Sequence, residues 1–482
     1  MRYRFSITGA MLGCLMASTI SAAAPGESAF RDPRGVEART APEPHQYWQP
    51  DKLLPVVTAP RHPEPLAGKT PLTLPELTEF ALRNNPKTRQ AWFAARAAAA
   101  GVGIEQADLL PQITANYAVT RTLPVSATTG SDSPWITRYG PSISLSYVLF
   151  DFGTQANQVE SAEYRLLAAN LTQNRALQDV VFQVEQAYYR LIGLDELVQT
   201  NELSLNNIRT AYEAAQKRRE SGLVTVADVY RVETQVAQAQ LNLTRSRGDL
   251  EKARGQLAAA VGLPVNNTLK VQTLASPPQT REITTTLTNL LERAKASRPD
   301  LVAAEAQARA ARATANATSR AGLPSIEIAG AAGRSGFQDS RPIVNNYTLG
   351  LNLRIPLFSG FRDTYSVRQA EAQAAQAEAA RDALYQQTEL DVWQSYYDLQ
   401  TAASGIGSTE AQVKSAEQTA QATLARYRAG FGSILDLITA QQDESNARVQ
   451  RIQSYLDWFT AFARLNFSIG ADNIMAVAGD KK

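Results

Sequence analysis

Two short polar motifs carry the residues whose types and spacing could do chemistry. Each places a hydroxyl residue three positions before an aspartate, as Thr225-x-x-Asp228 and Ser433-x-x-Asp436. A carboxylate at this position can accept hydrogen bonds at the start of a helix, in a variant of the capping box. It can also attract cations, and several copies of Asp436 brought together would form an acidic ring. Capping alone would justify both aspartates, and the two roles are compatible.

Basic residues and a glycine precede each motif, and together they describe the end of one helix and the start of the next. Cations stabilise the last turn of a helix, and glycine adopts the left-handed conformation that ends it. We therefore predict a helical hairpin tip at each motif. The residues at the two turns are Lys217, Arg218, Arg219 and Gly222, then Arg426, Arg428 and Gly430.

The residue types that many enzymes need are missing from the part of the sequence expected to fold. Both histidines, His45 and His62, lie in a proline-rich tail, and the only cysteine is Cys14. This excludes a histidine-dependent active site, disulfides and thiolate metal chemistry. The glycines of Gly405–Gly407 lack the following glycine or lysine of a phosphate loop. We predict no catalytic, cofactor or metal site, and the balance of 48 Lys+Arg against 46 Asp+Glu disfavours nucleic acid as a partner.

The chain repeats itself, first with an offset of 213 residues and then with one of 208. A slip of five residues between Pro111 and Leu149 separates the two registers. Constant offsets over such a length indicate a duplicated architecture. We therefore predict two structural repeats, 72–265 and 284–470. The matching pairs include Leu77 and Leu290, Ala81 and Ala294, Pro86 and Pro299, Tyr188 and Tyr396, Asp228 and Asp436, and Gly262 and Gly470.

The N-terminus has the pattern of a targeting segment. Arg2 and Arg4 precede an apolar run that ends in small residues, which predicts a secretory signal peptide at 1–23 with cleavage after Ala23. The alternative is a lipoprotein box that ends at Cys14 and would leave this cysteine lipidated.

Two tails flank the predicted repeats. Residues 24–71 should form an extended tail, because their prolines prevent helices and central strands. Residues 471–482 form a C-terminal tail. No run of 18 apolar residues occurs after residue 24, so we expect no transmembrane helix. A membrane-spanning role would then require β-strands.

Each repeat contains two segments in which apolar and polar residues alternate. About ten residues with one apolar face are typical of a transmembrane β-strand. Four strands cannot close a barrel, because the smallest such barrels need about eight. Packing on a soluble core is the alternative, but the alanine-rich helices offer no apolar layer, so we expect several chains to pool their strands. The predicted strands are about 112–121, 141–150, 325–334 and 346–356.

A very long helical pattern follows each predicted hairpin. Apolar or small residues recur in steps of three and four over about 152–220 and again over about 361–428, which indicates a near-heptad seam. At 1.5 Å per residue, each helix would extend roughly 100 Å. Gly405–Gly407 predicts a kink or an unwound turn midway along the second helix. A short helix and a longer one, the latter at 87–109 in the first repeat, precede each hairpin.

These features together resemble the TolC family of outer-membrane channels. The resemblance covers about residues 72–470 and rests on the order and spacing of several motifs. They are Leu149-Phe150-Asp151-x-Gly153, Leu357-Phe358-Ser359-Gly360, Ser221-Gly222-Leu223-x-x-x-x-Asp228 and Ala429-Gly430-Phe431-Gly432-Ser433-x-x-Asp436. It implies a mainly α fold with a small β part, built from a duplicated helix–β-hairpin–long-helix unit. Three copies would form an α-helical tunnel continued by a shared 12-stranded transmembrane β-barrel.

The resemblance also implies roles for residues at the tips. Asp436 would form a constricting ring, whereas the place of a second ring is taken by Thr439. Asp228 and Tyr427 would belong to a network that holds the periplasmic gate closed, but the arginine partner in that network corresponds to Gly432. The residues that match adaptor-docking tips are Gly222, Leu223, Gly430 and Phe431.

The leading hypothesis is an outer-membrane channel of a tripartite efflux or type I secretion system, which reaches into the periplasm. The implied partners are two further copies of the chain, a periplasmic adaptor (membrane fusion) protein, an inner-membrane transporter and outer-membrane lipid. The alternative is a periplasmic coiled-coil scaffold without a pore, which would leave the alternating strands unexplained. An enzyme has no supporting motif.

Overall fold

The computed structural model describes residues 71–123, 135–267, 269–272, 286–338 and 341–470. All of them lie in one compact unit, His62–Lys482. The predicted signal peptide with Cys14, the tail up to residue 70 and the C-terminal tail lie outside the described residues.

The described chain is mainly helical with one small sheet, and the same order of elements occurs twice. In each half a short helix and a medium helix lead to two strands, a very long helix and a returning helix. The first half is α1 (Leu74–Asn84), α2 (Pro86–Ala107), β1 (Gln112–Thr122), β2 (Ile136–Phe150), α3 (Thr154–Glu220) and α4 (Val226–Val261). The second is α5 (Leu287–Ser297), α6 (Pro299–Ala321), β3 (Ser325–Phe337), β4 (Val344–Arg354), α7 (Arg362–Arg428) and α8 (Ile434–Ser468).

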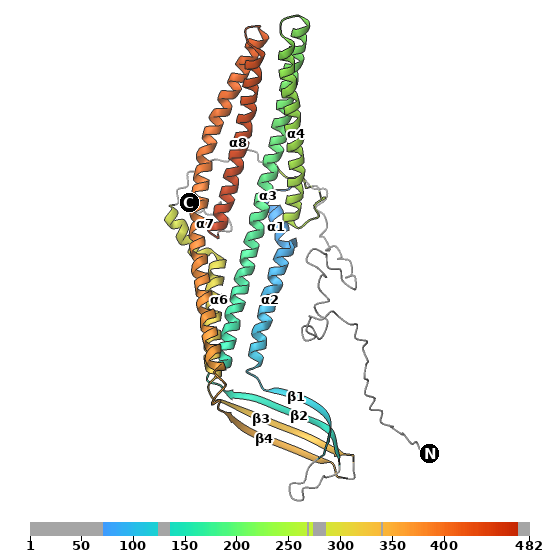
Figure 1. The fold of residues 1–482 in the computed structure, drawn as a ribbon, viewed down its shortest axis with the longest axis vertical. Helices are drawn as coiled ribbons and strands as arrows, with labels where there is room; N and C mark the ends of the chain where they lie inside the picture. The colour runs from blue at the N-terminus through green and yellow to red at the C-terminus, as the bar shows by residue number, and fades with distance from the viewer. Residues whose placement is uncertain (1–70, 124–134, 268, 273–285, 339–340, 471–482) are drawn as a thin grey trace, which may run out of the picture. The chain divides into compact units, whose positions relative to one another are not determined.

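The two long helices, α3 and α7, connect the strands to the tips (Figure 1). Each has 67 residues, so each extends about 100 Å at 1.5 Å per residue. Near the strands α3 packs against α2 and α6, and nearer the tips it packs against α4 and α8; α7 packs against α6 and then α8. The helices therefore form one layer whose edge helices are α2 and α4 on one side and α7 on the other.

The predicted unwound turn at Gly405–Gly407 is wrong, because α7 is one continuous helix through this segment. Ile406 is buried and packs into the apolar cluster between α7 and α8. The hydroxyl of Thr409 donates to the carbonyls of Gly405 and Ile406, 3.0 Å away in each case. Burial of the isoleucine thus offsets the low helix propensity of the two glycines.

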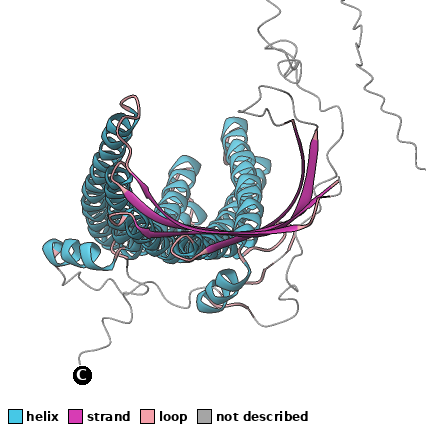
Figure 2. Cartoon of the chain, turned by 90° about the horizontal axis from the view of Figure 1, so that it is seen from below, coloured by secondary structure: helices cyan, strands magenta, loops and turns pink. Residues whose placement is uncertain are grey.

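The four strands form one antiparallel sheet in the order β1-β2-β3-β4, which curves strongly (Figure 2). Two observed strand bounds differ from the predicted ones by more than two residues. The strand β2 begins at Ile136, five residues before the predicted start, and β3 ends at Phe337, three residues later than predicted. The residues of β2 pair with both neighbours, and a bulge lies between Val148 and Phe150.

The two faces of the sheet differ in chemistry, because residues paired across strands share a face. On one face, leucine, isoleucine and tyrosine side chains predominate; Ile113 pairs with Leu145, and Ile328 pairs with Leu351. Most of these large side chains are exposed in the single chain. The other face carries mainly small or polar residues: Thr114, Asn116, Ala118, Ser142, Ser144, Ser146, Ala329, Ala331, Gly333, Thr348, Gly350 and Asn352.

A buried ionic cluster holds the C-terminal end of α8. The guanidinium of Arg298, whose side chain is 3% exposed, donates to Asp300 (2.6 Å), Asp391 (3.4 Å) and the carbonyl of Ser468 (3.3 Å). Arg175 of α3 lies 3.6 Å from Asp300. The cluster thereby joins α3, α6, α7 and the last turn of α8, whose carbonyls have no partner within their own helix.

In the first half, an uncharged side chain donates to the corresponding end of α4. Asn85 precedes Arg298 by 213 residues, and its amide donates to the carbonyl of Ala260 near the end of α4, at 2.9 Å. Nearby, Lys87 donates to Gln183 at 2.9 Å. The two halves have therefore kept the geometry of this contact while changing its charge.

Candidate functional site

The tip between α3 and α4 is a tight turn stabilised by a complete capping box. Gly222 has φ +72°, the left-handed conformation that glycine adopts without strain. Thr225 caps α4: its backbone N–H and hydroxyl donate to the Asp228 carboxylate at 3.0 and 2.7 Å, and the N–H of Asp228 donates back at 3.3 Å. The hydroxyl and then the backbone N–H of Thr225 lower the pKa of Asp228 below its ordinary value.

The tip between α7 and α8 has the same turn but only half of the box. Gly430 has φ +86°, and the N–H of Asp436 donates to the Ser433 hydroxyl at 3.1 Å. The carboxylate of Asp436 is exposed and has no hydrogen-bond or ion-pair partner among the described residues. The predicted capping role is thus filled by Ser433, and the charge of Asp436 stays available to ligands.

Arg218 connects the two tips. Its guanidinium donates to the carbonyl of Tyr427 at 3.0 Å and lies 4.6 Å from the centre of that ring. Tyr427 is 3% exposed and belongs to an apolar cluster shared by the two hairpins. The sequence predicts only a helix-terminal role for Arg218, because the partner lies 209 residues away.

The side chains of Asp228 and Tyr427 form no hydrogen bond with each other in the single chain. Thr225 satisfies the Asp228 carboxylate, and the Tyr427 hydroxyl is buried without a hydrogen-bond partner among the described atoms. Gly432 lies close to the backbone of Tyr427, where an added Cβ would be 3.1 Å from the Tyr427 nitrogen. Arg218 is thus the observed partner of Tyr427 in the single chain, and the gate role implied for Asp228 and Tyr427 stays a prediction.

Two large apolar side chains protrude at the tips. Phe431 is 81% exposed and Leu223 is 67% exposed. Each directly follows the left-handed glycine of its turn, Gly430 or Gly222, whose Cβ position is not obstructed by backbone. The four residues predicted for adaptor docking are thus all at the exposed ends of the hairpins.

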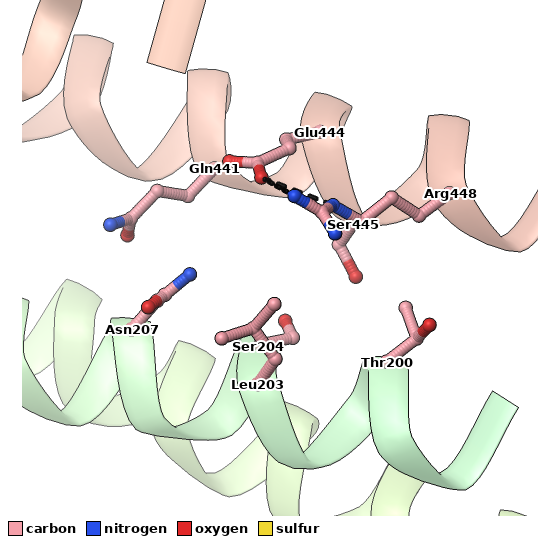
Figure 3. Close-up of a pocket in the computed structure, with 8 residues that line it drawn as sticks. All are labelled: Thr200, Leu203, Ser204, Asn207, Gln441, Glu444, Ser445 and Arg448. Carbon is pink, nitrogen blue, oxygen red and sulfur yellow. Dashed lines mark hydrogen bonds and ion pairs between the residues drawn. The ribbon is translucent and has the colours of Figure 1, made fainter. Parts of the chain in front are cut away.

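A polar groove lies between α3 and α8, further from the tips (Figure 3). In it Glu444 pairs with Arg448 at 2.8 Å, and the side chain of Gln441 extends toward that of Asn207. The Gln441 carbonyl oxygen is buried without a partner among the described atoms. The remaining lining residues are Thr200, Leu203, Ser204 and Ser445. We assign no ligand to this groove.

Within the described residues, no three histidine, cysteine, aspartate or glutamate side chains are grouped closely enough to hold a metal ion.

The described part of the chain contains no helix that is both long enough and apolar enough to cross a membrane.

The sequence profile of the outer membrane efflux protein family matches residues 77–263 and 290–471, one match in each half. The chain belongs to this family. Membership confirms the resemblance inferred from the motifs and places the protein in the outer membrane.

Relatives of this outer membrane efflux protein include secretion proteins. Protein CyaE of Bordetella pertussis is 26% identical over 401 residues, 81% of this chain and 82% of the relative. The proteases secretion protein PrtF of Dickeya chrysanthemi is 26% identical, covering 82% and 87%. The outer membrane protein TolC of Vibrio cholerae is 23% identical, covering 82% and 90%. The crystal structure of VceC from Vibrio cholerae has the same fold, with a TM-score of 0.73 at 22% identity over 83% of this chain and 96% of VceC.

We predict that Arg218→Ala loosens the contact between the two hairpins of this efflux protein. The substitution removes one hydrogen bond and one cation–π contact, each worth about 0.5–1.5 kcal/mol. Hydrogen–deuterium exchange of the backbone around Tyr427 should become several-fold faster. Arg219→Ala is the matched control, because Arg219 is exposed and its side chain makes no hydrogen bond, ion pair or cation–π contact among the described residues. Equal exchange in the two variants would show that Arg218 does not connect the tips.

Proposed function

We propose that this efflux protein is the outer-membrane channel of a tripartite efflux or type I secretion system. It would act as a passive duct from the periplasm to the exterior. One observation carries the proposal: the chain contains a curved sheet with one exposed apolar face and a long layer of helices, and both have open edges. We expect no catalytic activity and no cofactor, since channel proteins of this kind only conduct their cargo.

The open edges support a closed ring of three copies. Among the described residues β1 and β4 each pair with one neighbour only, and an unpaired edge inside a membrane is costly. Four strands are too few for a barrel, whereas three copies supply 12, within the observed range. The edge helices α2, α4 and α7 would close at the same time, which gives a helical tunnel continuous with the barrel.

A pore-free periplasmic scaffold is the other candidate. It would leave the apolar face of the sheet in water, where patches of this extent are rare on soluble proteins. Ile113, Tyr117, Tyr347 and Leu349 all belong to this exposed face. In the trimeric channel the same face would lie against lipid, so one assembly would account for the exposed residues and the unpaired strands together.

The mass and conductance of the purified protein test this proposal. The mature chain in detergent should have the protein mass of three copies and should form conducting pores in planar bilayers. A water-soluble, well-folded monomer without pore activity would contradict it. A trimer without conductance would support the trimeric assembly but would contradict an open duct under those conditions.

The hairpin tips would be the place where the periplasmic adaptor docks, and the inner-membrane transporter would join the complex through that adaptor. Leu223 and Phe431 are the strongest candidates for direct contact, because each protrudes beside a turn that Gly222 or Gly430 keeps compact. A crosslinker placed at Ser221 or Ala429 of the mature chain should capture the adaptor.

We further propose that Asp436 lines the narrowest part of the tunnel and makes it selective for cations. Threefold symmetry would bring three of its unpartnered carboxylates together, each at the start of α8. The partial positive charge of a helix N-terminus interacts favourably with a negatively charged side chain at this position. Thr439, one turn further on, would not add a second ring.

The Asp436→Ala channel should therefore lose most of its cation selectivity and its block by multivalent cations. Reversal potentials across a salt gradient in planar bilayers measure this. Asp228→Ala serves as the control, because it removes a carboxylate that Thr225 already holds. If the two channels kept the same selectivity as the wild type, Asp436 would be only part of a helix start.

A further inference from the structure

Two aromatic stacks join α3 to α8 below the polar groove. The ring of Phe182 stacks on Phe467 with centroids 4.7 Å apart, and the ring of Tyr189 stacks on Phe459 at 4.5 Å. The members of each helix are seven or eight residues apart, about two turns. The stacks therefore enclose one further side-chain position on each helix.

Glu185 occupies this position on α3, where it is half-buried. It lies three residues after Phe182 and four before Tyr189, and residues at these separations share one helix face. On α8 the matching position is Ala463, which is four residues from each stacked phenylalanine and is buried. A methyl group offers no hydrogen bond, and the described residues provide Glu185 with no hydrogen-bond or ion-pair partner.

The charged groups on the surrounding elements are paired elsewhere or exposed. On α3 itself, Tyr188 donates to the carbonyl of Gln272 and Arg175 joins the ionic cluster of Arg298 and Asp300 on α6. The groups on the other neighbours are Lys87 of α2, bound to Gln183; Arg83 of α1, paired with Glu79; Lys252 and Arg254 of α4, paired with Asp249 and Glu251; Arg451 of α8, paired with Glu196; and Asp457 and Arg464 of α8, both exposed. None of them neutralises a carboxylate at Glu185.

The energetic consequence follows from burial. Removing a carboxylate from water without a partner disfavours its charged form, and burial raises the pKa of Glu185 to about 7. The pKa of Tyr189 is raised as well, first by burial and then by the charge of Glu185. The neutral acid is the form that fits between the stacks.

We propose that the contact between α3 and α8 responds to protons: neutral Glu185 fits between the two aromatic stacks, and its ionisation loosens the packing of α8 on α3. This contact is one of the places where the two halves of the chain meet, so loosening it would free the α7–α8 hairpin relative to α3. The proposal concerns packing within one chain and stands whether or not the protein is a channel.

The direction of the pH dependence follows from the difference between the pKa of Glu185 in the open and in the closed state of the contact. When the contact between α3 and α8 is open, Glu185 would ionise at its ordinary pKa of 4.5. When the contact is closed, its pKa is about 7. Between these values the closed state holds the extra proton, so opening becomes more favourable by up to about tenfold per pH unit. Above pH 7 Glu185 is ionised in both the open and the closed state. The free energy of opening then no longer changes with pH through this residue.

Hydrogen–deuterium exchange of the mature protein in detergent tests the proposal at pH 5 and pH 7.5. After correction for the intrinsic pH dependence of exchange, protection of α8 residues 455–468 should fall by one to two orders of magnitude in the wild type. In Glu185→Gln, which keeps the shape and removes the charge, protection should change little between the two pH values. Glu213→Gln, an exposed glutamate of the same helix, should behave as the wild type.

A pH dependence that survives in Glu185→Gln would overturn the proposal, as would a wild type whose protection is the same at both pH values. If Glu185→Gln failed to fold, difference infrared spectroscopy of the wild type would decide. A neutral carboxyl with a midpoint near pH 7 supports the proposal, and its absence between pH 6 and 8 refutes it.

Discussion

Replacing Arg298 by alanine should lower the free energy of unfolding by about 3–5 kcal/mol, the range found when one partner of a buried ion pair is removed. The substitution leaves Asp300 and Asp391 without their guanidinium and the carbonyl of Ser468 without its donor. Burial alone would raise the pKa of Asp300, but the hydrogen bond from Arg298 and the charge of Arg175 outweigh it, so the pKa is lowered. Heat denaturation followed by circular dichroism measures the loss.

The first half of the chain provides the matched control. Asn85→Ala removes the equivalent donor to Ala260, but it leaves no buried charge behind. Its cost should be about 1–3 kcal/mol, that of an unsatisfied buried acceptor. If Arg298→Ala cost no more than Asn85→Ala, the ionic cluster would add nothing to the helix-end contact that both halves share.

Replacing Leu351 by arginine should destabilise the membrane-inserted protein by about 2–4 kcal/mol if this position lies near the bilayer midplane. Leu351 is 67% exposed in the single chain and pairs with Ile328 on the apolar face of the sheet. In the proposed trimer this face meets lipid, where a guanidinium is poorly solvated. Urea unfolding of the protein in lipid vesicles measures the change.

Asn352→Arg distinguishes the two faces of the same strand. Asn352 is the next residue of β4, pairs with Glu327 and belongs to the face with small and polar residues. Arginine there should be nearly neutral, because this face would line a water-filled interior. Equal destabilisation by the two substitutions would contradict the assignment of the lipid-facing side.

The long helices were predictable because their signals are local and repeated many times. The observed bounds of α3 are Thr154–Glu220, against a prediction of about 152–220, since an apolar seam and a glycine after the last turn define it. The start of β2 was missed because Gly140-Pro141 suggests the end of a strand. In the structure, β2 continues through both residues. Its pairing with β3 is interrupted between Tyr139 and Ser142, which accommodates a proline without an N–H.

The candidate site shows the same division between local and distant information. The turns at Gly222 and Gly430 were predicted from neighbouring residues, and the glycines have the expected left-handed conformation. The partner of Arg218 was not predicted, because only tertiary packing brings it to Tyr427. The unpartnered carboxylate of Asp436 was not predictable either, since Asp436 has the same sequence pattern as Asp228.

The polar face of the sheet has a consequence for cargo. Glycine, alanine and serine at Gly333, Ala331 and Ser144 have few or no side-chain rotamers to lose. Cargo passing over these positions would displace few side chains, and the groups of this face that can hydrogen-bond to it, such as Asn116 and Asn352, lie at other positions. In the proposed trimer, the part of the duct lined by the sheet would then admit solutes of very different chemistry. Selection between solutes would take place at the hairpin tips and in the partner proteins that deliver them.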